Sequence, residues 1–165
     1  MRLLEPTILP RLLATRVEFP FGGTAVKTRA FLAQRSNGEN AWIYASSHVK
    51  DYVDHIKELG GAKYQLLTHR DEASKYCNTL EAPVFCHELE KDAIVKKGSR
   101  LDESFSGPSH ELGDDMIAYH APGHTDGATC YLWKMNENES VLFTGDTVFG
   151  QSDSKLGVAI HPSIW

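Results

Sequence analysis

The sequence has few cysteines, no long apolar run and no excess of positive charge, and each absence excludes a class of protein. Three cysteines in 165 residues are an odd number, which argues against a disulfide-stabilised scaffold and favours a reducing, cytoplasmic compartment. No apolar run approaches the roughly 18 residues that a membrane-spanning helix needs. The net charge of −5 gives no electrostatic reason to expect nucleic acid or an anionic membrane as a partner.

The remaining composition is that of an ordinary globular domain. Hydrophobic residues make up 41% of the chain, so we expect a single domain with one core over residues 1–165. The first 13 residues, MRLLEPTILPRLL, include several apolar ones. Pro6 and Pro10 interrupt them, and no small-residue cleavage site follows. We therefore do not interpret this segment as a signal peptide.

The first half of the chain alternates between strand and helix patterns. Residues 28–34 and 41–45 have the composition of two short strands, and 64–68 that of a buried strand. Between them lies an apolar stripe at helical spacing, which Ser46 or Ser47 can cap. The stripe consists of Val49, Tyr52, Val53, Ile56 and Leu59. Strand, helix and strand in this order favour an α/β layered domain.

The second half begins with short elements and ends in strands. We expect a short helix at 72–79, a strand at 83–86 and a brief helical stretch at 87–92. The polar segment 95–114 is rich in Gly and Ser and predicts a loop or an irregular hairpin. Three further strands are predicted at 116–119, 129–133 and 141–144, the last two joined by the polar turn 136–138.

Three segments place polar residues directly after an apolar strand, at 67–72, 121–127 and 143–147. Strand ends in layered α/β folds are where ligand-binding groups gather, because the strand fixes direction and the loop gives access. Pro122 and Gly123 form a rigid turn before an imidazole, and a glycine before an aspartate allows close backbone approach. Imidazoles and carboxylates are ligands that zinc and iron favour.

Most histidines of the chain have a simpler interpretation than metal binding. We assign a solvated or structural role to His48, His55, His87 and His110, and favour a structural role for His120. The pair Cys86-His87 is best explained by a buried thiol at a strand end beside a surface histidine. For Asp146 the alternative is a turn-capping carboxylate in Gly-Asp-Thr.

Three short motifs resemble those of the metallo-β-lactamase superfamily. Residues 122–127, Pro-Gly-His-Thr-Asp-Gly, resemble its P-G-H-T-x-G segment, and 144–146, Thr-Gly-Asp, resemble its G-D segment. Residues 66–69, Leu-Leu-Thr-His, resemble the start of its T-H-x-H-x-D-H metal motif. The motifs occur in the family's order, and the resemblance covers roughly residues 28 to 150. It implies an αββα sandwich with a metal site at the strand ends.

The His motif departs from the family pattern at three positions. Asp71 occupies the second His position, Ala73 the Asp position and Ser74 the last His position. These departures remove most ligands of the family's second metal, so a two-metal hydrolase is not expected. The resemblance leaves His69, His124 and Asp146 as the ligands of one zinc or iron ion.

Asp71 has two predicted roles in this site. It is a fourth metal ligand or an acceptor that orients His69, and it is also the favoured general base, ahead of Asp126. Arg70 is expected to be a surface cation paired with Asp71 or Glu72. Two imidazoles and one carboxylate are the ligand set of mononuclear iron oxygenases, and the family's persulfide dioxygenases use the corresponding positions.

The resemblance also implies a further strand, helices and a late histidine after the G-D segment. Only residues 147–165 follow it, and His161 is the one candidate for that histidine. We expect that part of the C-terminal layer is missing, or that a partner chain, as in a homodimer, covers the sheet. Two functions remain open: an enzyme acting on a small-molecule ester, thioester or thiol-derived substrate, or an inactive homologue that binds or dimerises.

Overall fold

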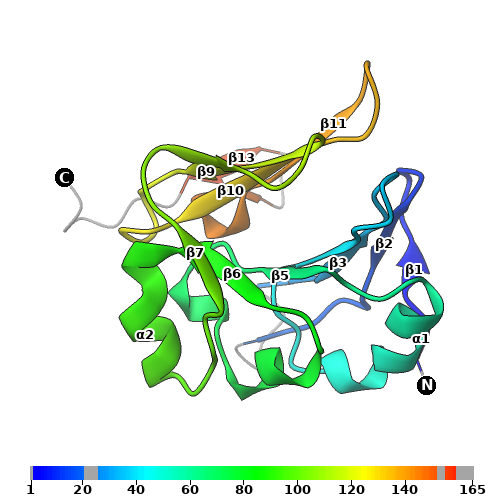
Figure 1. The fold of residues 1–165 in the computed structure, drawn as a ribbon, viewed down its shortest axis with the longest axis horizontal. Coiled ribbons are helices and arrows are strands. Elements are labelled where there is room, and N and C mark those ends of the chain that lie inside the picture. Colours follow the sequence, from blue (N-terminus) through cyan, green and yellow to red (C-terminus); the bar gives the residue numbers. More distant parts are fainter. Residues whose placement is uncertain (1, 21–25, 152–154, 159–165) are drawn as a thin grey trace.

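The computed structural model describes residues 2–20, 26–151 and 155–158, and these form two facing β-sheets with helices against the larger one (Figure 1). The larger sheet contains, in spatial order, β1 (Glu5–Pro6), β2 (Leu12–Ala14), β3 (Phe31–Ala33), β4 (Ala41–Ile43), β5 (Tyr64–Leu66), β6 (Val84–His87) and β7 (Glu103–Phe105). The smaller sheet contains β11 (Ser140–Phe143), β10 (Thr129–Lys134), β9 (Met116–His120) and β8 (Ser109–Glu111). A separate pair consists of β12 (Val148–Gly150) and β13 (Leu156–Val158).

Helical segments connect the central strands of the larger sheet. Strands β4 to β7 are parallel, so each connection must cross from one end of the sheet to the other. The α-helices are α1 (Val53–Glu58) and α2 (Lys91–Lys96), and both lie on the face of the larger sheet that points away from the smaller one (Figure 1). The 3-10 helices are η1 (Val49–Asp51), η2 (Arg70–Glu72), η3 (Lys75–Thr79), η4 (Glu88–Glu90) and η5 (Gly145–Thr147).

Alternation along the strands divides the core into a layer between the sheets and a layer under the helices. Leu32 and Trp42 pack with the buried residues of η1 and α1. Their strand neighbours Ala33 and Ile43 pack with Trp133 and other side chains of the smaller sheet. Each large apolar side chain buried in these layers contributes roughly 1.5–3 kcal/mol. Two-sided burial explains why β4 is apolar at every position.

The predicted helices occur in shorter pieces. The helix expected from Ser46 or Ser47 begins with η1, and Ser46 Oγ accepts the His48 N–H at 3.1 Å instead of capping α1. The helix expected at 72–79 is replaced by parts of η2 and by η3. The helical stretch expected at 87–92 continues as α2 to Lys96. The strands at 116–119, 129–133 and 141–144 are present, and β10 and β11 form the predicted antiparallel hairpin.

Most of 95–114 is irregular, as predicted, but its two short strands do not form a hairpin. This segment contains β7 and β8, but β7 pairs with β6 in the larger sheet and β8 pairs with β9 in the smaller one. The chain therefore crosses between the sheets here (Figure 1). Phe105 is the one buried residue of β7, and all of β8 is exposed, so neither strand has an apolar pattern that reveals it.

The N-terminal region differs from expectation, whereas the smaller sheet agrees with the expected lack of part of the C-terminal layer. The segment before residue 28 adds β1 and β2 to the larger sheet, a pairing the sequence did not predict. Both α-helices among the described residues lie on the larger sheet, and Tyr119 and Leu142 of the smaller sheet are exposed. His161, the candidate late histidine, lies outside the described residues. Within 2–20, 26–151 and 155–158, no helix is long and apolar enough to cross a membrane.

Candidate metal centre

Three loops bring His69, His124 and Asp146 together at the ends of β5, β9 and β11. His69 Nε2 lies 3.4 Å from Asp146 Oδ2, and His124 Nε2 lies 3.6 Å from the same oxygen. One ligand atom from each residue falls within 4.8 Å of the others. Metal–ligand bonds of about 2.0–2.1 Å place tetrahedral ligands about 3.3–3.4 Å apart. The three side chains therefore have the spacing of ligands around one ion.

The two imidazoles present buried nitrogen atoms that have no hydrogen-bond partner. His69 Nε2 and His124 Nε2 are both buried and unpaired, although such atoms are normally satisfied. Their rings meet edge to face, with centroids 4.5 Å apart and planes at 77°. The shared carboxylate oxygen of Asp146 supplies negative charge at the point where both nitrogens converge. This donor set fits a divalent metal ion.

The local structure around His69 controls which ring nitrogen carries a proton. His69 caps η2, and its Nδ1 accepts the N–H of Asp71 at 3.2 Å. In the neutral ring the proton is then on Nε2, facing Asp146. Burial lowers the pKa of His69, while the nearby carboxylate of Asp146 acts in the opposite direction. The ring is therefore held neutral, which is the state that binds metals.

Gly145 allows the loop of Asp146 to approach the end of β5. Its φ is +54°, and a Cβ at this position would lie 2.7 Å from Thr68 Cβ. The Gly145 N–H donates to Tyr44 Oη at 3.1 Å, and Tyr44 itself has a φ of +66°. Two left-handed residues thus fix the position of Asp146. The close approach at Gly145 agrees with the prediction from sequence.

Asp71 lies at the edge of this group and is held by a lysine. Its Oδ1 accepts from Lys97 Nζ at 2.6 Å, while its Oδ2 lies 3.6 Å from His124 Nε2 and 3.9 Å from His69 Nδ1. Burial tends to raise the pKa of Asp71, but the hydrogen bond and charge of Lys97 bring the pKa below its ordinary value. The carboxylate is therefore ionised and adjacent to both imidazoles.

Glu72 is a residue of the site that the sequence interpretation missed. Its Oε1 lies 3.6 Å from His69 Nε2, and its side chain is 13% exposed. Both carboxyl oxygens bond to Thr68, one to the backbone N–H at 3.0 Å and one to the hydroxyl. Burial raises the pKa of Glu72 to about 8. Its place three residues after His69, on the turn of η2, was the only signal in the sequence.

The predicted pairing of Arg70 with Asp71 or Glu72 was wrong. Arg70 Nε lies 2.8 Å from Glu90 Oε2, and Arg70 Nη2 lies 3.6 Å from Asp126 Oδ2. The contact with Glu90 requires a long-range approach of η4 to η2, which local spacing does not reveal. The alternative base, Asp126, is thereby directed toward the guanidinium of Arg70.

The two remaining positions of the family's His motif have structural roles. Ala73 is buried in the cluster that contains Leu67, Cys77 and Ile94. Ser74 Oγ accepts the N–H of Tyr76 at 3.3 Å and caps η3. Neither position offers a metal ligand: Ala73 packs in the core and Ser74 caps a helix.

The other histidines are placed by ordinary contacts, with one correction. His55 Nδ1 accepts the N–H of Leu4, and His48 and His110 are exposed. His87, expected at the surface, is 2% exposed and stacks on His120 with ring centroids 4.0 Å apart. His87 is buried because β7 lies beside β6. This pairing places the ring centroid of Phe105 4.7 Å from that of His87. His120 Nε2 bonds to the Asp126 carbonyl at 2.8 Å, so its role is structural, as predicted.

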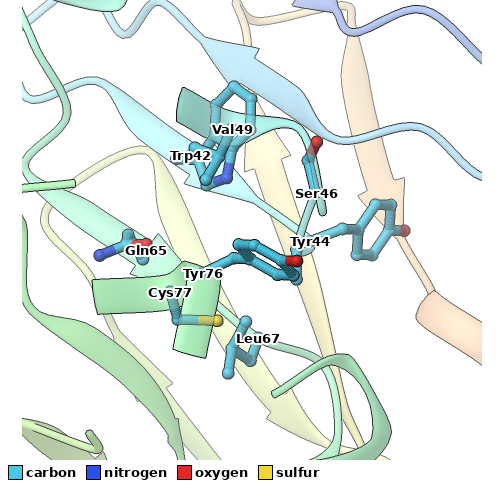
Figure 2. Close-up of a pocket in the computed structure, with 9 residues that line it drawn as sticks. Trp42, Tyr44, Ser46, Val49, Gln65, Leu67, Tyr76 and Cys77 are labelled. Carbon is cyan, nitrogen blue, oxygen red and sulfur yellow. The ribbon is translucent and has the colours of Figure 1, made fainter. Parts of the chain in front are cut away.

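A shallow apolar pocket lies on the helical side of β4 (Figure 2). Trp42, Val49, Tyr76 and Cys77 are among its lining residues, and none of the three converging ligands is. Tyr44 also lines it and is the connection to the metal centre, through its bond with Gly145.

Comparisons with known proteins identify the fold and little of the function. No family model matches the chain. TRPM8 channel-associated factor 2 of Mus musculus is 34% identical over 62 residues, which are 36% of this chain and 7% of that protein. TRPM8 channel-associated factor 1 of Pongo abelii is 27% identical over 84 residues, 50% of this chain and 8% of that protein. The chain thus spans less than a tenth of the length of these relatives.

Solved metallo-β-lactamase structures match most of the chain. TMB-1 superposes with a TM-score of 0.69 and 20% identity, over 92% of this chain and 74% of that one. The metallo-β-lactamase of Pontibacter korlensis gives 0.71 and 17%, over 90% and 74%. IND-7 gives 0.65 and 17%, over 91% and 73%. The expected fold is confirmed: the described residues form the αββ part of a metallo-β-lactamase-like αββα sandwich, and the chain matches about three quarters of each solved chain.

Proposed function

We propose that this chain, which has the metallo-β-lactamase fold, binds a single metal ion through His69, His124 and Asp146. We further propose that it catalyses hydrolysis of an ester or thioester in a small-molecule substrate. The convergence of two unpaired imidazole nitrogens on one carboxylate oxygen carries the proposal. An ion held by these groups supplies a Lewis acid and makes water more acidic.

The surrounding residues prepare the ligands for this task. Burial keeps His69 neutral, and the turn at Gly145 orients Asp146 without a change of backbone. Use of Nε2 as a ligand requires the proton of His69 to be on Nδ1. The nearest carboxylate oxygen to that atom is Asp71 Oδ2, at 3.9 Å. In that tautomer Nδ1 no longer accepts the Asp71 N–H; instead, Asp71 Oδ2 accepts from Nδ1 and orients the ring, and the Lys97 contact keeps Asp71 ionised.

Asp71 is also our candidate for the general base. It is ionised and 55% exposed, and it lies beside His124 Nε2 at 3.6 Å, so it can reach a water near the ligands. Asp71 Oδ2 is also the atom that would bind the ion if Asp71 is its fourth ligand. Both uses require Asp71 Oδ2 to remain free of Lys97, which bonds to Oδ1.

The identity of the ion selects between two chemistries. Zinc supports the hydrolysis proposed above, whereas two imidazoles and one carboxylate also suit a mononuclear iron site. Iron would redirect the function to oxidation of a thiol-derived substrate. The three cysteines are free thiols, in keeping with our proposal of a reducing, cytoplasmic compartment.

A second candidate function is binding or dimerisation without turnover. It is favoured by the ion pair of Asp71 with Lys97 and by the structural roles of Ala73 and Ser74. The relatives with sequence similarity are named for association with a channel, which also suits a binding role. The exposed apolar residues of the smaller sheet, Tyr119 and Leu142, offer a surface for a second copy.

Metal analysis separates these functions. The chain is purified without a nickel column or chelator, and zinc and iron are measured per mole of protein. We expect close to one ion in the wild type and almost none in His124→Ala and Asp146→Asn, with unfolding temperatures of the metal-free proteins nearly unchanged. Hydrolysis of a panel of thioesters and esters should be lost in the same two variants. A metal-free wild type that binds neither ion on addition would overturn the proposal.

A further inference from the structure

A single buried carboxylate connects the two loops that carry the histidine ligands. Glu90, the last residue of η4, is 0% exposed. Its Oε2 accepts from the backbone N–H of Arg70 at 2.7 Å and from the side-chain Nε at 2.8 Å. Its Oε1 accepts from the Gly127 N–H at 2.7 Å and from Arg70 Nη2 at 3.1 Å. Four donors thus surround one carboxylate.

These donors lie close in sequence to the proposed ligands. Arg70 is the residue after His69, in the segment that follows β5 of the larger sheet. Gly127 belongs to the loop of residues 121–128, which contains His124 and connects β9 to β10 of the smaller sheet. Because Glu90 bonds to both backbones, it fixes the distance between two loops that belong to different sheets.

The contact between Glu90 and the backbone of Gly127 leaves no room for a side chain at residue 127. A Cβ at this position would lie 2.7 Å from both Glu90 Cγ and Glu90 Oε1. A backbone without a side chain is therefore required for Glu90 to reach the loop of His124. The guanidinium of Arg70 balances the charge of Glu90, so the carboxylate is paired as well as hydrogen-bonded.

Energetic stabilisation is a weak explanation of this arrangement. A buried ion pair gains little net free energy, because desolvation of both charges offsets their attraction. Its geometric effect is larger, since charge-assisted hydrogen bonds to two backbones have strict directions. The helix that follows also contributes Lys97, the residue after its last turn, to the site through Asp71.

We infer that Glu90 is a positioning residue that holds His69 and His124 at the spacing required by one metal ion. It acts through the backbone N–H groups of Arg70 and Gly127 and does not touch the ion. This role rests on the proposed metal site. Residues that orient metal ligands typically change metal affinity by 10–100-fold when mutated.

The test compares Glu90→Gln with a matched variant far from the site. Asp115→Asn is the control, because Asp115 pairs with the fully buried Arg35 at 2.8 Å through its Nε. Cobalt(II) is the probe, since its visible spectrum reports ligand geometry. We expect Glu90→Gln to bind cobalt at least tenfold more weakly than wild type with an altered spectrum. Asp115→Asn should stay within twofold, even at an equal loss of thermal stability. Equal cobalt affinities in the two variants would overturn the inference.

A metal-independent measurement keeps this inference distinct from the proposed function. In the metal-free proteins, amide hydrogen exchange at Arg70 or Gly127 should be at least tenfold faster in Glu90→Gln than in wild type, because the amide keeps one oxygen and can accept from only one of these two N–H groups. The exchange rates in Asp115→Asn should match wild type after correction for stability. Unchanged exchange in both loops would contradict the inference. Faster exchange in either loop, with no cobalt bound by the wild type, would overturn the metal site instead and leave the connection between the loops intact.

If Glu90→Gln does not fold, Gly127→Ala serves in its place. Its Cβ would lie 2.7 Å from Glu90 Cγ and Oε1, so Glu90 must move away from the loop of His124. We expect at least a threefold loss of cobalt affinity. An unchanged affinity and spectrum would overturn the inference by this route as well.

Discussion

His69 lies three residues after β5, and His87 is the last residue of β6, the next parallel strand of the larger sheet. Each caps a 3-10 helix through Nδ1, which accepts the N–H of the residue two positions later, at 3.2 Å for Asp71 and 3.3 Å for Leu89. Each leaves its Nε2 buried without a hydrogen-bond partner. Each also contacts a second histidine from the region around the β9–β10 loop.

The groups that face the unpaired Nε2 atom differ between His69 and His87. The ring of His69 meets His124 edge to face, and both Nε2 atoms approach a carboxylate oxygen of Asp146. The ring of His87 stacks almost parallel on His120, with planes at 13°. Among the described residues, only the cluster of His69, His124 and Asp146 has three metal-binding groups within reach of one ion. Two adjacent imidazoles are therefore not enough to make a candidate metal site. The carboxylate of Asp146, shared by His69 and His124, distinguishes that candidate site from the stacked pair of His87 and His120.

The largest expected difference comes from the same substitution in both histidines. In His69→Asn and His87→Asn, the new Oδ1 can accept the N–H that Nδ1 accepts now, so the local turn is preserved. His69→Asn should lower cobalt affinity by at least about 100-fold, because loss of a direct ligand exceeds the effect of outer partners. His87→Asn should change it less than threefold. Cobalt titration followed by absorption measures both, and equal effects would remove the distinction between the pairs.

The next effect concerns the backbone that presents the carboxylate. Gly145→Ala adds a Cβ in contact with Thr68 and strains a φ of +54°, so we expect a loss of about 2–4 kcal/mol in unfolding free energy. Cobalt affinity should fall more than tenfold as Asp146 moves. Gly38→Ala is the control, since its φ is +79° with open space around it, and should cost only about 1–2 kcal/mol. Urea unfolding gives both values, and a cobalt affinity that survives Gly145→Ala would show that the close approach is dispensable.

The parts of this site that the sequence predicted are local. The Pro-Gly turn before His124 and the glycine before Asp146 have strict backbone requirements, so a few adjacent letters identify them. The strands that precede the three segments have clear apolar patterns. Turn chemistry and strand ends identified the three segments, and the resemblance to the metallo-β-lactamase motifs was needed to predict His69, His124 and Asp146 as one ligand set.

The parts that were missed depend on contacts between distant segments. Glu90 meets Arg70 across 20 positions and Gly127 across 37, and nothing in the local sequence reveals such a meeting. His87 is buried because β7 crosses beside β6, and β7 has too few apolar residues to be recognised. Glu72 turns inward because Thr68 offers it two donors. Sequence patterns describe one element at a time, whereas these roles arise from the packing of several.

A smaller change in cobalt affinity is expected from Asp71, which lies two positions after His69 as Leu89 does after His87. Asp71→Leu copies into the segment of His69 the residue that Leu89 provides after His87. If Asp71 orients His69 or binds the ion, cobalt affinity should fall about tenfold. Asp71→Asn should lose less, because an amide oxygen still accepts. Lys97→Met, which frees the carboxylate, should leave affinity unchanged or raise it, and a loss under twofold in Asp71→Leu would assign Asp71 a surface role only.

The smallest expected effect is the pH dependence of the stacked pair. Burial lowers the pKa of His87, and the neighbouring His120 adds to this effect, while Glu88 and Glu90 oppose it. A folded-state pKa below the unfolded value of about 6.5 means that the unfolded chain takes up the proton more readily as the pH falls. Stability from the neutral ring is thus complete above about pH 6.5 and is lost below it, with a slope of at most about 1.4 kcal/mol per pH unit.

His87→Phe removes this proton while keeping a flat ring on His120. The variant loses the Leu89 N–H bond, which should cost about 1 kcal/mol at every pH. We expect urea unfolding curves of the metal-free proteins to diverge from pH 7.5 to 5.5, with the variant losing less stability than the wild type. His69, whose pKa burial also lowers, titrates in both proteins, so its contribution cancels in the difference. Parallel pH profiles would mean that the folded protein protonates His87 as readily as the unfolded chain does. The unpaired Nε2 of His87 would then be no obstacle to charge, and the carboxylate beside His69 and the ring geometry would remain as the differences between the two histidines.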